Sequence, residues 1–472
     1  MAYTAFITRI KNLRPHPNAD RLQMGECFGN TVIVSLDYVD NQLGVYFPSD
    51  GQVSTEFAEA NNLLRKKDEN GHNIGGYMDP DKRNITAIKL RGEKSDGLFL
   101  PITCLAAFGP VSDLNVGDTI DIFNGVEICK KYIPKRQYSN KPHQVARRAK
   151  ANLAPTFYEH VDTAQLAYNL GQFKTGDVVE LTLKMHGTSG RTGYLPLVKH
   201  KQSWLDKLLK KPGKEYREYG YVIGTRRVVL DGIRDGGYYD DNSFRHAMSK
   251  KFEGKLHKGE TVYYEIVGFV NENTPIMASV KNSKIKDKAF SKQYGEETVF
   301  SYGCDPNGEW EEKTYSATKY SPEYGLEPET ETIAPKCEVY VYRMTQVNED
   351  GDVVELSPDQ VRYRCEQMGV KTVPVFERFI IPETEIESMD VSFTTRIVVN
   401  PGEYVLRKVE EYFDGPDPIG KTHIREGVVA RIVNRPNIAV YKHKSFNFKV
   451  LEGIIKDEAA EPDMEEAQEV QE

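Results

Sequence analysis

Short runs of β-branched and aromatic residues, each bounded by a turn signal, dominate this chain and limit what it can fold into. Within residues 1–125 the runs are AFITRI, TVIVSL, QLGVYFP, ITAIKL and TIDIF, separated by HPNAD, PSDG, RGEKSDG and NVGD. One stretch, STEFAEANNLL, has helical character, with Ser54 or Thr55 as its N-cap. This spacing predicts a small closed or half-closed β-barrel over residues 1–125.

Residues 151–456 predict a second, larger domain that mixes strands with helices. Strand-like runs such as VVELTLKM, TVYYEIVGFV, CEVYVYRMT and GVVARIV alternate with helical stretches such as SPDQVRYRCEQMG. Residues 199–214 and 311–335 look like inserts into this pattern. We therefore expect an α+β protein of two domains.

The net charge of -8 is unevenly distributed along the chain. Residues 457–472 contain eight acidic residues and no lysine or arginine. This segment is too charged and too poor in large apolar residues to fold alone, so it is expected to be a disordered acidic tail. The other 62 acidic residues (70 minus 8) balance the 62 lysines and arginines, so the remainder of the chain is neutral.

A basic segment separates the two expected domains. Residues 126–150 contain one acidic residue, Glu127, and eight basic residues: Lys130, Lys131, Lys135, Arg136, Lys141, Arg147, Arg148 and Lys150. Such a segment is either a solvated linker or a surface that contacts phosphates. The second interpretation makes Lys130, Lys131, Arg147 and Arg148 candidates for nucleic-acid binding.

Composition excludes several other classes of protein. The mean hydropathy is -0.55, and no apolar stretch approaches the roughly 20 residues that a membrane helix needs. The first residues have no apolar segment typical of a secretory signal. The six cysteines include no CxxC pair, so we expect reduced and mostly buried thiols rather than a metal site. We expect a cytoplasmic protein without a membrane partner.

Lys184 is the first candidate for chemistry, because it ends an apolar strand-like run in LTLKMHGTSGR. Partial burial or nearby cations can turn such a lysine into a nucleophile. Gly187 permits close backbone approach to a ligand. A lysine near a strand end is common, however, and this motif is weak by itself.

Later segments supply groups that suit the same chemistry. Glu265 lies in YYEIVG, and Glu426 lies in IREGVV. Lys442 and Lys444, in VYKHKSFNFKV, are two apart on a strand, so both side chains point to one face and can converge on one phosphate. Together they provide a nucleophile, oxygen ligands and cations, which are the groups needed to transfer a nucleotide.

The order of KMHGTS, YYEIVG, VYVYRM, REGVV and KHK resembles that of the covalent nucleotidyltransferase superfamily of ATP-dependent RNA and DNA ligases and mRNA capping enzymes. The resemblance implies an ATP-grasp-like nucleotidyltransferase domain in which Lys184 attacks the α-phosphate of ATP and forms lysyl-AMP. Having His186 in place of the aspartate of DNA ligases makes the motif more similar to that of RNA ligases.

The same resemblance assigns roles to the other positions. Glu265 would contact the ribose, Glu426 would lie near a Mg²⁺ or Mn²⁺ ion, and Lys442 with Lys444 would contact the α-phosphate. Tyr340 or Tyr342, in VYVYRM, would stack on the base. A looser match makes Arg226 or Arg227, in IGTRRVVL, the arginine near the 5'-phosphate of the nucleic acid.

Two further features make the chain most similar to the Deinococcus-type RNA ligases. Only 28 residues follow Lys444 (472 minus 444), too few for the OB domain that ends DNA ligases and capping enzymes. The HPNADRL and KLRGEKSDGLFLP segments resemble instead an N-terminal OB-fold module. That family seals 3'-OH and 5'-phosphate ends at nicks in duplexes with RNA on the 3'-OH side.

Two alternatives remain at this point. The chain could be a non-catalytic OB-fold RNA-binding protein whose second domain is degenerate, since a fold alone does not imply function. It could also be a capping-type guanylyltransferase, which the short C-terminal segment disfavours. Whether the RNA is sealed for repair or for processing is left open.

Overall fold

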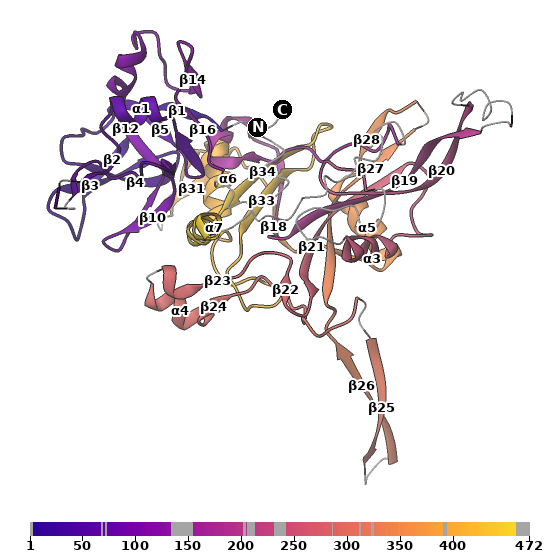
Figure 1. The fold of residues 1–472 in the computed structure, drawn as a ribbon. Helices are drawn as coiled ribbons and strands as arrows, with labels where there is room; N and C mark the ends of the chain where they lie inside the picture. The colour runs from indigo at the N-terminus through magenta and orange to yellow at the C-terminus, as the bar shows by residue number, and fades with distance from the viewer. Residues whose placement is uncertain are drawn as a thin grey trace. The chain divides into compact units, whose positions relative to one another are not determined.

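The computed structural model describes residues 3–67, 69–70, 73–133, 154–201, 204, 213–230, 242–285, 287–310, 313–321, 325–348, 350–389 and 394–458. The chain divides into two units (Figure 1). Unit 1 comprises Met1–Tyr138 and Ser445–Pro462, and unit 2 comprises Ser139–Lys444 and Asp463–Glu472. The first division therefore falls beyond the predicted boundary at residue 125, and residues 445–456 group with the N-terminal residues rather than with the second domain.

Unit 1 consists of small antiparallel sheets. The largest, of four strands, has the order β12-β5-β1-β13, and two three-stranded sheets have the orders β2-β3-β4 and β16-β6-β9. The strands of these sheets are β1 (Ala5–Arg9), β2 (Lys11–Pro15), β3 (Leu22–Cys27), β4 (Asn30–Ser35), β5 (Leu43–Phe47), β6 (Gly51–Val53), β9 (Asn84–Ile85), β12 (Leu98–Pro101), β13 (Thr119–Ile120) and β16 (Cys129–Lys131). Two-stranded pairs are formed by β7 (Lys66–Lys67) with β8 (Asn73–Gly75), β10 (Ala87–Leu90) with β11 (Glu93–Asp96), and β14 (Ile122–Phe123) with β15 (Val126–Glu127).

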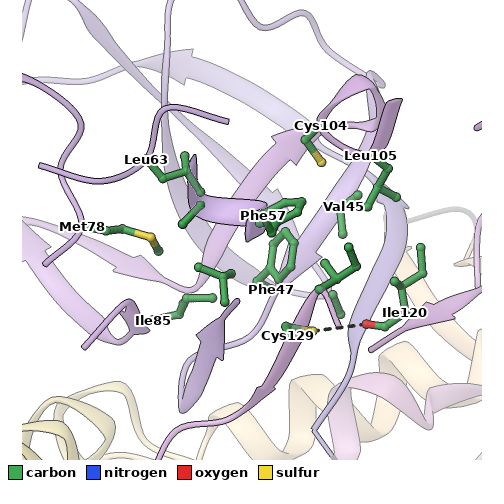
Figure 2. Close-up of a cluster of buried hydrophobic side chains, with 14 of the residues drawn as sticks. Val45, Phe47, Phe57, Leu63, Met78, Ile85, Cys104, Leu105, Ile120 and Cys129 are labelled. Carbon is green, nitrogen blue, oxygen red and sulfur yellow. Dashed lines mark hydrogen bonds between the residues drawn. The ribbon is translucent and has the colours of Figure 1, made fainter. Parts of the chain in front are cut away.

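One apolar cluster fills the interior of unit 1 (Figure 2). Val45 and Phe47 of β5 meet Phe57 of helix α1 (Thr55–Ala60), and Cys129 donates a hydrogen bond through Sγ to the Ile120 carbonyl. In β4 and β6 buried residues alternate with more exposed ones, as the two-residue period of a strand predicts, whereas β5 is buried on both faces from Gly44 to Phe47. No closed sheet is formed by the described strands of unit 1, so the OB-like barrel remains a prediction.

Helix α7 (Phe446–Glu458) belongs to unit 1, although it follows directly on the last strand of unit 2. Phe448 and Leu451 are fully buried, and Lys449 forms an ion pair with the buried carboxylate of Asp96 on β11. The helix packs near β10, where Gly453 lies beside Thr86. It extends through the first two residues of the predicted acidic tail, and residues 459–472 lie outside the described part of the chain.

Two mostly antiparallel sheets form the body of unit 2, with parallel pairs only of β17 with β34 and of β27 with β29 among the described strands of these sheets. A five-stranded sheet has the order β17-β34-β33-β18-β30, and a seven-stranded sheet has β20-β19-β21-β27-β28 as its main path, with β22 and β29 at its sides. The first contains β17 (Ala164–Gln165), β18 (Val178–Lys184), β30 (Val375–Ile380), β33 (Gly427–Ile432) and β34 (Ala439–Lys444). The second contains β19 (Thr188–Lys201), β20 (Lys214–Gly224), β21 (Glu260–Asn271), β22 (Thr274–Pro275), β27 (Cys337–Val347), β28 (Val353–Glu355) and β29 (Lys371–Thr372).

Each sheet of unit 2 buries one face in its own apolar core. In the five-stranded sheet Val179 and Leu181 of β18 pack with Val428 of β33. In the seven-stranded sheet Tyr264 and Ile266 pack with other apolar residues of β27 and the helices. The residues that alternate with these core residues along each strand, among them Lys184 and Glu265, must therefore point to the opposite face of each sheet.

Helices cover the core of the seven-stranded sheet. α3 (Ser243–Lys250) and α5 (Pro358–Met368) pack there, whereas α6 (Pro401–Glu410) packs on the five-stranded sheet. The N-terminus of α5 has a capping box between Ser357 and Gln360, and Gly369 ends it in the left-handed region at φ 66°. This helix confirms the prediction from SPDQVRYRCEQMG.

Smaller elements complete unit 2. They are α4 (Lys288–Tyr294) and the strand pairs β23 (Val280–Lys281) with β24 (Glu297–Thr298), β25 (Lys313–Ser321) with β26 (Gly325–Ile333), and β31 (Thr384–Met389) with β32 (Thr394–Val398). The expected insert at residues 311–335 corresponds to the hairpin of β25 with β26. The expected insert at residues 199–214 begins in β19 and ends in β20, and most of the residues between these strands lie outside the described part of the chain.

Two expectations from composition can be compared with the structure. All six cysteines are buried and unpaired with one another, and burial raises the pKa of Cys27, Cys104 and Cys365 to about 12. No described helix is long and apolar enough to cross a membrane.

Candidate active site

Lys184 lies at the end of β18, where the chain leaves the five-stranded sheet for the seven-stranded one. Val179, Leu181 and Leu183 of this strand are buried in or beside the core, so Lys184 points to the opposite face. Met185, His186 and Gly187, which we call the Lys184 loop, then lead into β19. The alternation of the strand thus places the predicted nucleophile where the two sheets meet.

Gly187 is required by the close approach of the Lys184 loop to β21. A Cβ atom at this position would lie 2.4 Å from the Ile266 carbonyl oxygen and 2.8 Å from Cγ of Glu265. Only glycine allows the loop to come so near the strand that carries Glu265. The sequence analysis explained Gly187 by close approach to a ligand. In the structure, the close packing of the Lys184 loop against β21 already requires a glycine at this position.

Glu426 immediately precedes β33 and is 2% exposed. Its Oε1 lies 2.7 Å from Nζ of Lys184 and 3.3 Å from Nζ of Lys444. Nδ1 of His186 is 3.8 Å from the other carboxylate oxygen. A buried carboxylate is stable only when it is paired, and here it is held between two ammonium groups.

Lys442 and Lys444 project from the site face of β34. They are opposite Val429 and Gly427 of β33, while Tyr441, which directly precedes Lys442, is buried in the core. Burial, and then the charges of Lys444 and Lys184, lower the pKa of Lys442 to about 8. Three clustered lysines with a single close carboxylate form a cationic site that favours a polyanionic ligand.

The seven-stranded sheet contributes a row of polar and aromatic side chains. Ser189 of β19, Glu265 of β21 and Tyr340 of β27 are cross-strand neighbours in register and lie on the face opposite the core. The Ser189 hydroxyl donates to a Glu265 carboxylate oxygen at 3.4 Å. The fold therefore brings Glu265 and Tyr340 together as direct neighbours on one face.

The two candidate tyrosines of β27 have different surroundings. Tyr340 lines an open hollow of about 620 Å³ with Lys371, Thr372 and Ile419. Tyr342 lies at an irregularity in the strand pairing, and its ring is 5.0 Å from that of His160. Burial and the charge of Arg343 lower the pKa of His160 to about 3, so this imidazole is neutral and acts as a packing surface.

Arg226 and Arg227 lie in a turn that follows β20. Arg226 forms an ion pair with Asp162, whose second oxygen is 3.7 Å from Arg227. The charge of Arg226 also contributes to the lowered pKa of Lys442, after burial and the charges of Lys444 and Lys184.

Arg191, 1% exposed, donates hydrogen bonds to the carbonyls of Thr225 and Arg227 and so holds the turn that carries Arg226. It also bonds the Phe157 carbonyl. Arg191 and Asp162 were not predicted from the sequence. Arg191 is the last residue of LTLKMHGTSGR, but nothing in that segment indicated that the arginine would be buried, and Asp162 belongs to no recognisable motif.

The basic segment predicted for nucleic-acid binding divides between described and undescribed residues. Lys130 and Lys131 belong to β16 of unit 1, where Lys130 pairs with Glu127 at 2.8 Å. They are therefore part of a folded strand rather than of a linker. Arg147 and Arg148 lie outside the described residues.

The donor set at the lysine cluster suits a hard divalent cation that keeps most of its own water. No group of three or more acidic, histidine or cysteine side chains that could hold a metal occurs among the described residues. Glu426 is a buried carboxylate stabilised by contacts with two ammonium groups, and it could offer a carboxylate oxygen to a cation. One carboxylate with waters and substrate phosphates is an environment in which Mg²⁺ is commonly bound.

The fold is that of solved RNA ligases. Variants of the Naegleria gruberi RNA ligase match it: one with ATP and manganese at TM-score 0.54 and 14% identity, covering 94% of this chain and 98% of that chain. A second variant, with AMP and manganese, gives 0.53 and 14%, covering 96% and 99%. The same enzyme with PPi gives 0.51 and 14%, covering 96% and 98%.

The model of the RNA ligase family matches residues 177–451, more than half of the chain. This chain therefore belongs to the RNA ligase family, and it is an RNA ligase. The matched range contains Lys184, Glu265, Glu426, Lys442 and Lys444. The prediction of an RNA ligase is thereby confirmed, and the non-catalytic and capping alternatives are set aside. A search of curated proteins found no match.

Proposed function

We propose that this RNA ligase is ATP-dependent and joins 3'-OH and 5'-phosphate ends through a lysyl-AMP intermediate on Lys184. The observation that carries the proposal is the position of Lys184 at the end of β18, 2.7 Å from Glu426 and among the charges of Lys442 and Lys444. The Naegleria gruberi enzyme, which shares the fold, has been solved with ATP, AMP and PPi.

In the first step Nζ of Lys184 forms a bond to the α-phosphorus of ATP, and the bond from that phosphorus to the pyrophosphate oxygen breaks. Negative charge increases on the departing pyrophosphate and on the α-phosphate oxygens. Lys442 and Lys444 lie on the same face as Lys184 and can stabilise this charge without rearrangement. Glu426 lies within hydrogen-bonding distance of the Lys184 ammonium and can accept its proton.

In the second step the AMP moves from Lys184 to the 5'-phosphate of a polynucleotide, which restores the free lysine. The 3'-OH then attacks that phosphate, a phosphodiester bond forms, and AMP leaves. Arg226 and Arg227 are the groups we assign to the 5'-phosphate, because IGTRRVVL resembles the segment with the 5'-phosphate arginine in the ligase superfamily and Arg191 holds the turn that carries them. Asp162 must share these arginines with the phosphate or release them.

Glu265 and Tyr340 are the residues we assign to the nucleoside. Their side chains are adjacent on one face, so a ribose bound at Glu265 would put its base beside Tyr340. Tyr340 borders the open hollow, whereas the ring of Tyr342 packs against His160. We therefore propose that Tyr340, rather than Tyr342, stacks on the base.

Glu426 is the residue we propose as ligand of a Mg²⁺ or Mn²⁺ ion. When bound, such an ion would neutralise part of the charge on the ATP phosphates. The buried carboxylate would then exchange contacts with Lys184 and Lys444 for contacts with the cation. The presence of manganese in the Naegleria gruberi structures agrees with a site for a divalent ion in this fold.

For the polynucleotide we propose a nicked duplex with RNA on the 3'-OH side, as in the Deinococcus-type ligases. Unit 1, which we propose to be an OB-like module, would supply further contacts, and Lys130 and Lys131 of β16 are its candidate phosphate ligands. The segment with Arg147 and Arg148 is proposed for the same purpose.

Sealing of defined substrates tests this function. Purified protein with ATP and Mg²⁺ should join a nick whose 3'-OH strand ends in RNA, and a matched nick with DNA there should react much more slowly. Equal sealing of both substrates would contradict the proposed RNA requirement. A failure to seal any 3'-OH and 5'-phosphate nick, with either ATP or GTP, would contradict the proposed reaction.

A further inference from the structure

Two loops flank the reactive groups of the proposed active site. One is the Lys184 loop, and the other consists of residues 415–425, which precede Glu426 and which we call the 415–425 loop. Lys184 ends β18 and is paired with Gly427 of β33, so the sheet brings the backbones of Lys184 and Glu426 together. The two loops continue from these residues beyond the paired strands, so the contacts that hold the loops also bear on the 2.7 Å contact between the two side chains.

Tyr302 lies between these loops and contacts both. Its hydroxyl accepts a hydrogen bond from the backbone N–H of His186 at 2.7 Å, at the middle of the Lys184 loop. Its ring meets the ring of His423 edge to face, with centroids 4.5 Å apart. The residue is 2% exposed, so these contacts are formed in the interior of unit 2.

The backbone of Tyr302 is in an unfavourable conformation. Its φ is 49°, in the left-handed region that residues with a bulky side chain rarely adopt. Such conformations persist where the surrounding structure holds them, and they concentrate at functional sites. Here the turn directs the Tyr302 side chain toward the Lys184 loop.

The 415–425 loop has internal hydrogen bonds of its own. Asp417, fully buried, accepts hydrogen bonds from the backbone N–H groups of Ile419 and Gly420. A Cβ atom at Gly420 would lie 2.8 Å from the backbone nitrogen of Gly303, so the backbone of this loop packs against the turn that carries Tyr302. Tyr302 therefore packs against a loop whose conformation is held by hydrogen bonds.

The far end of the Lys184 loop is held by a different residue. Arg245 of α3, 5% exposed, donates to the Ser189 carbonyl at 2.7 Å and also bonds the Thr188 hydroxyl. β18 fixes one end of the Lys184 loop, and the start of β19 fixes the other. His186 lies between these ends and is the residue of the loop whose backbone Tyr302 contacts.

We propose that Tyr302 is a positioning residue for lysine adenylation: it fixes the Lys184 loop against the 415–425 loop and so aligns Lys184 with Glu426 and the incoming α-phosphate. This inference rests on the proposed function of Lys184. It adds a residue that touches no substrate and lies in the segment between β21 and β27, outside every motif of the sequence.

Burial supports this role, because the hydroxyl is kept neutral. Burial, and the nearby charges of Glu426, Asp417 and Glu265, raise the pKa of Tyr302 well above its usual value, against the effect of the bond from His186. The hydroxyl is therefore protonated throughout the working range of pH and offers the His186 N–H a constant acceptor.

Tyr302→Phe tests the inference, because it removes the hydroxyl and keeps the ring that packs on His423. In single turnovers at saturating ATP, lysyl-AMP formation should slow about tenfold, as expected for loss of about 1.4 kcal/mol of alignment in the transition state. The KM for ATP should stay within about twofold of wild type, because Tyr302 does not touch the nucleotide.

The matched control is Tyr264→Phe. Tyr264 is also buried, and its hydroxyl is 2.9 Å from Oγ1 of Thr192. This variant should lose at least as much thermal stability as Tyr302→Phe and keep the wild-type rate of lysyl-AMP formation.

Sealing of a nick that already carries AMP on its 5'-phosphate separates positioning from general damage. This reaction needs no attack by Lys184, so Tyr302→Phe should perform it at close to the wild-type rate. A wild-type rate of lysyl-AMP formation in Tyr302→Phe, or an equal slowing of both reactions, would overturn the inference. If the wild-type protein forms no lysyl-AMP, the proposed function itself is wrong.

Discussion

Replacing Lys442 with methionine should stabilise the free protein at neutral pH, although it removes a group proposed to bind phosphate. Lys442 is partly buried beside Lys444 and Lys184, and its pKa falls from 10.5 to about 8. At about 1.36 kcal/mol per unit, that shift corresponds to roughly 3 kcal/mol of lost folding free energy. Methionine keeps the length and shape of the side chain without its charge.

The pH dependence of this penalty follows from the number of protons that Lys442 binds in the folded and in the unfolded protein. Below about pH 8 Lys442 is charged both in the folded and in the unfolded protein, so the whole penalty is present. Between about pH 8 and 10.5 the folded protein releases the proton and the unfolded chain keeps it, so the penalty decreases. At pH 9.5 it should be about 1 kcal/mol.

Urea denaturation at pH 7 and pH 9.5, followed by circular dichroism, measures this difference. Lys442→Met should exceed wild type by about 1 to 3 kcal/mol at pH 7 and by clearly less at pH 9.5. Lys408→Met is the control, because Lys408 is bonded to Glu377 at 3.2 Å and its removal should give no gain in stability. A less stable Lys442→Met at pH 7, or a gain independent of pH, would refute the reasoning.

Three further predictions concern separate parts of the molecule. Tyr340→Ala should weaken ATP binding by about 1 to 3 kcal/mol in calorimetry, as loss of base stacking does, whereas Tyr342→Ala should change ATP binding little. A larger loss of binding in Tyr342→Ala than in Tyr340→Ala would assign base stacking to Tyr342 instead. Glu426→Gln should abolish metal-dependent lysyl-AMP formation and lower the midpoint of thermal unfolding, because two ammonium groups lose their carboxylate; an active variant would remove Glu426 from the site. Phe448→Ala should destabilise unit 1 by about 3 to 5 kcal/mol, measured as faster hydrogen exchange in β10 and β11. Unchanged exchange in these strands would show that α7 is not part of the core of unit 1.

The reactive part of the site could be predicted from the sequence because the relevant groups lie on regular strands. Lysines two apart share a face of any strand, and a lysine that ends an apolar run must leave the core face. Lys184, Lys442 and Lys444 are examples, and the structure places them on the site face of one sheet. Helix α5 was equally predictable from its capping residues.

Other parts depend on contacts between distant segments and leave no local signal. Tyr302 and Arg245 hold the Lys184 loop from segments more than fifty residues away, and each looks like an ordinary core or surface residue in the sequence. Helix α7 directly follows β34, yet it completes unit 1 through Phe448 and Leu451. Which core an apolar face joins is decided by the whole fold and cannot be read from its periodicity.

The uneven distribution of charge along the chain explains how an acidic protein can offer a cationic site. The excess of acidic over basic residues lies after residue 456, while the site of unit 2 places Lys184 and Lys444 on one buried carboxylate, with Lys442 on the same strand as Lys444. An acidic net charge is therefore compatible with a polyanionic substrate. Such a substrate is attracted by the electrostatic field of the binding site rather than by the net charge of the whole chain.

The most direct test of the account is whether Lys184 becomes covalently adenylated. Incubation with Mg²⁺ and α-labelled ATP should give a protein-bound label that survives denaturation and maps to the peptide containing Lys184. Lys184→Ala, with unchanged circular dichroism, should take no label. A folded wild-type protein that stays unlabelled, or an equal label in Lys184→Ala, would contradict the central claim.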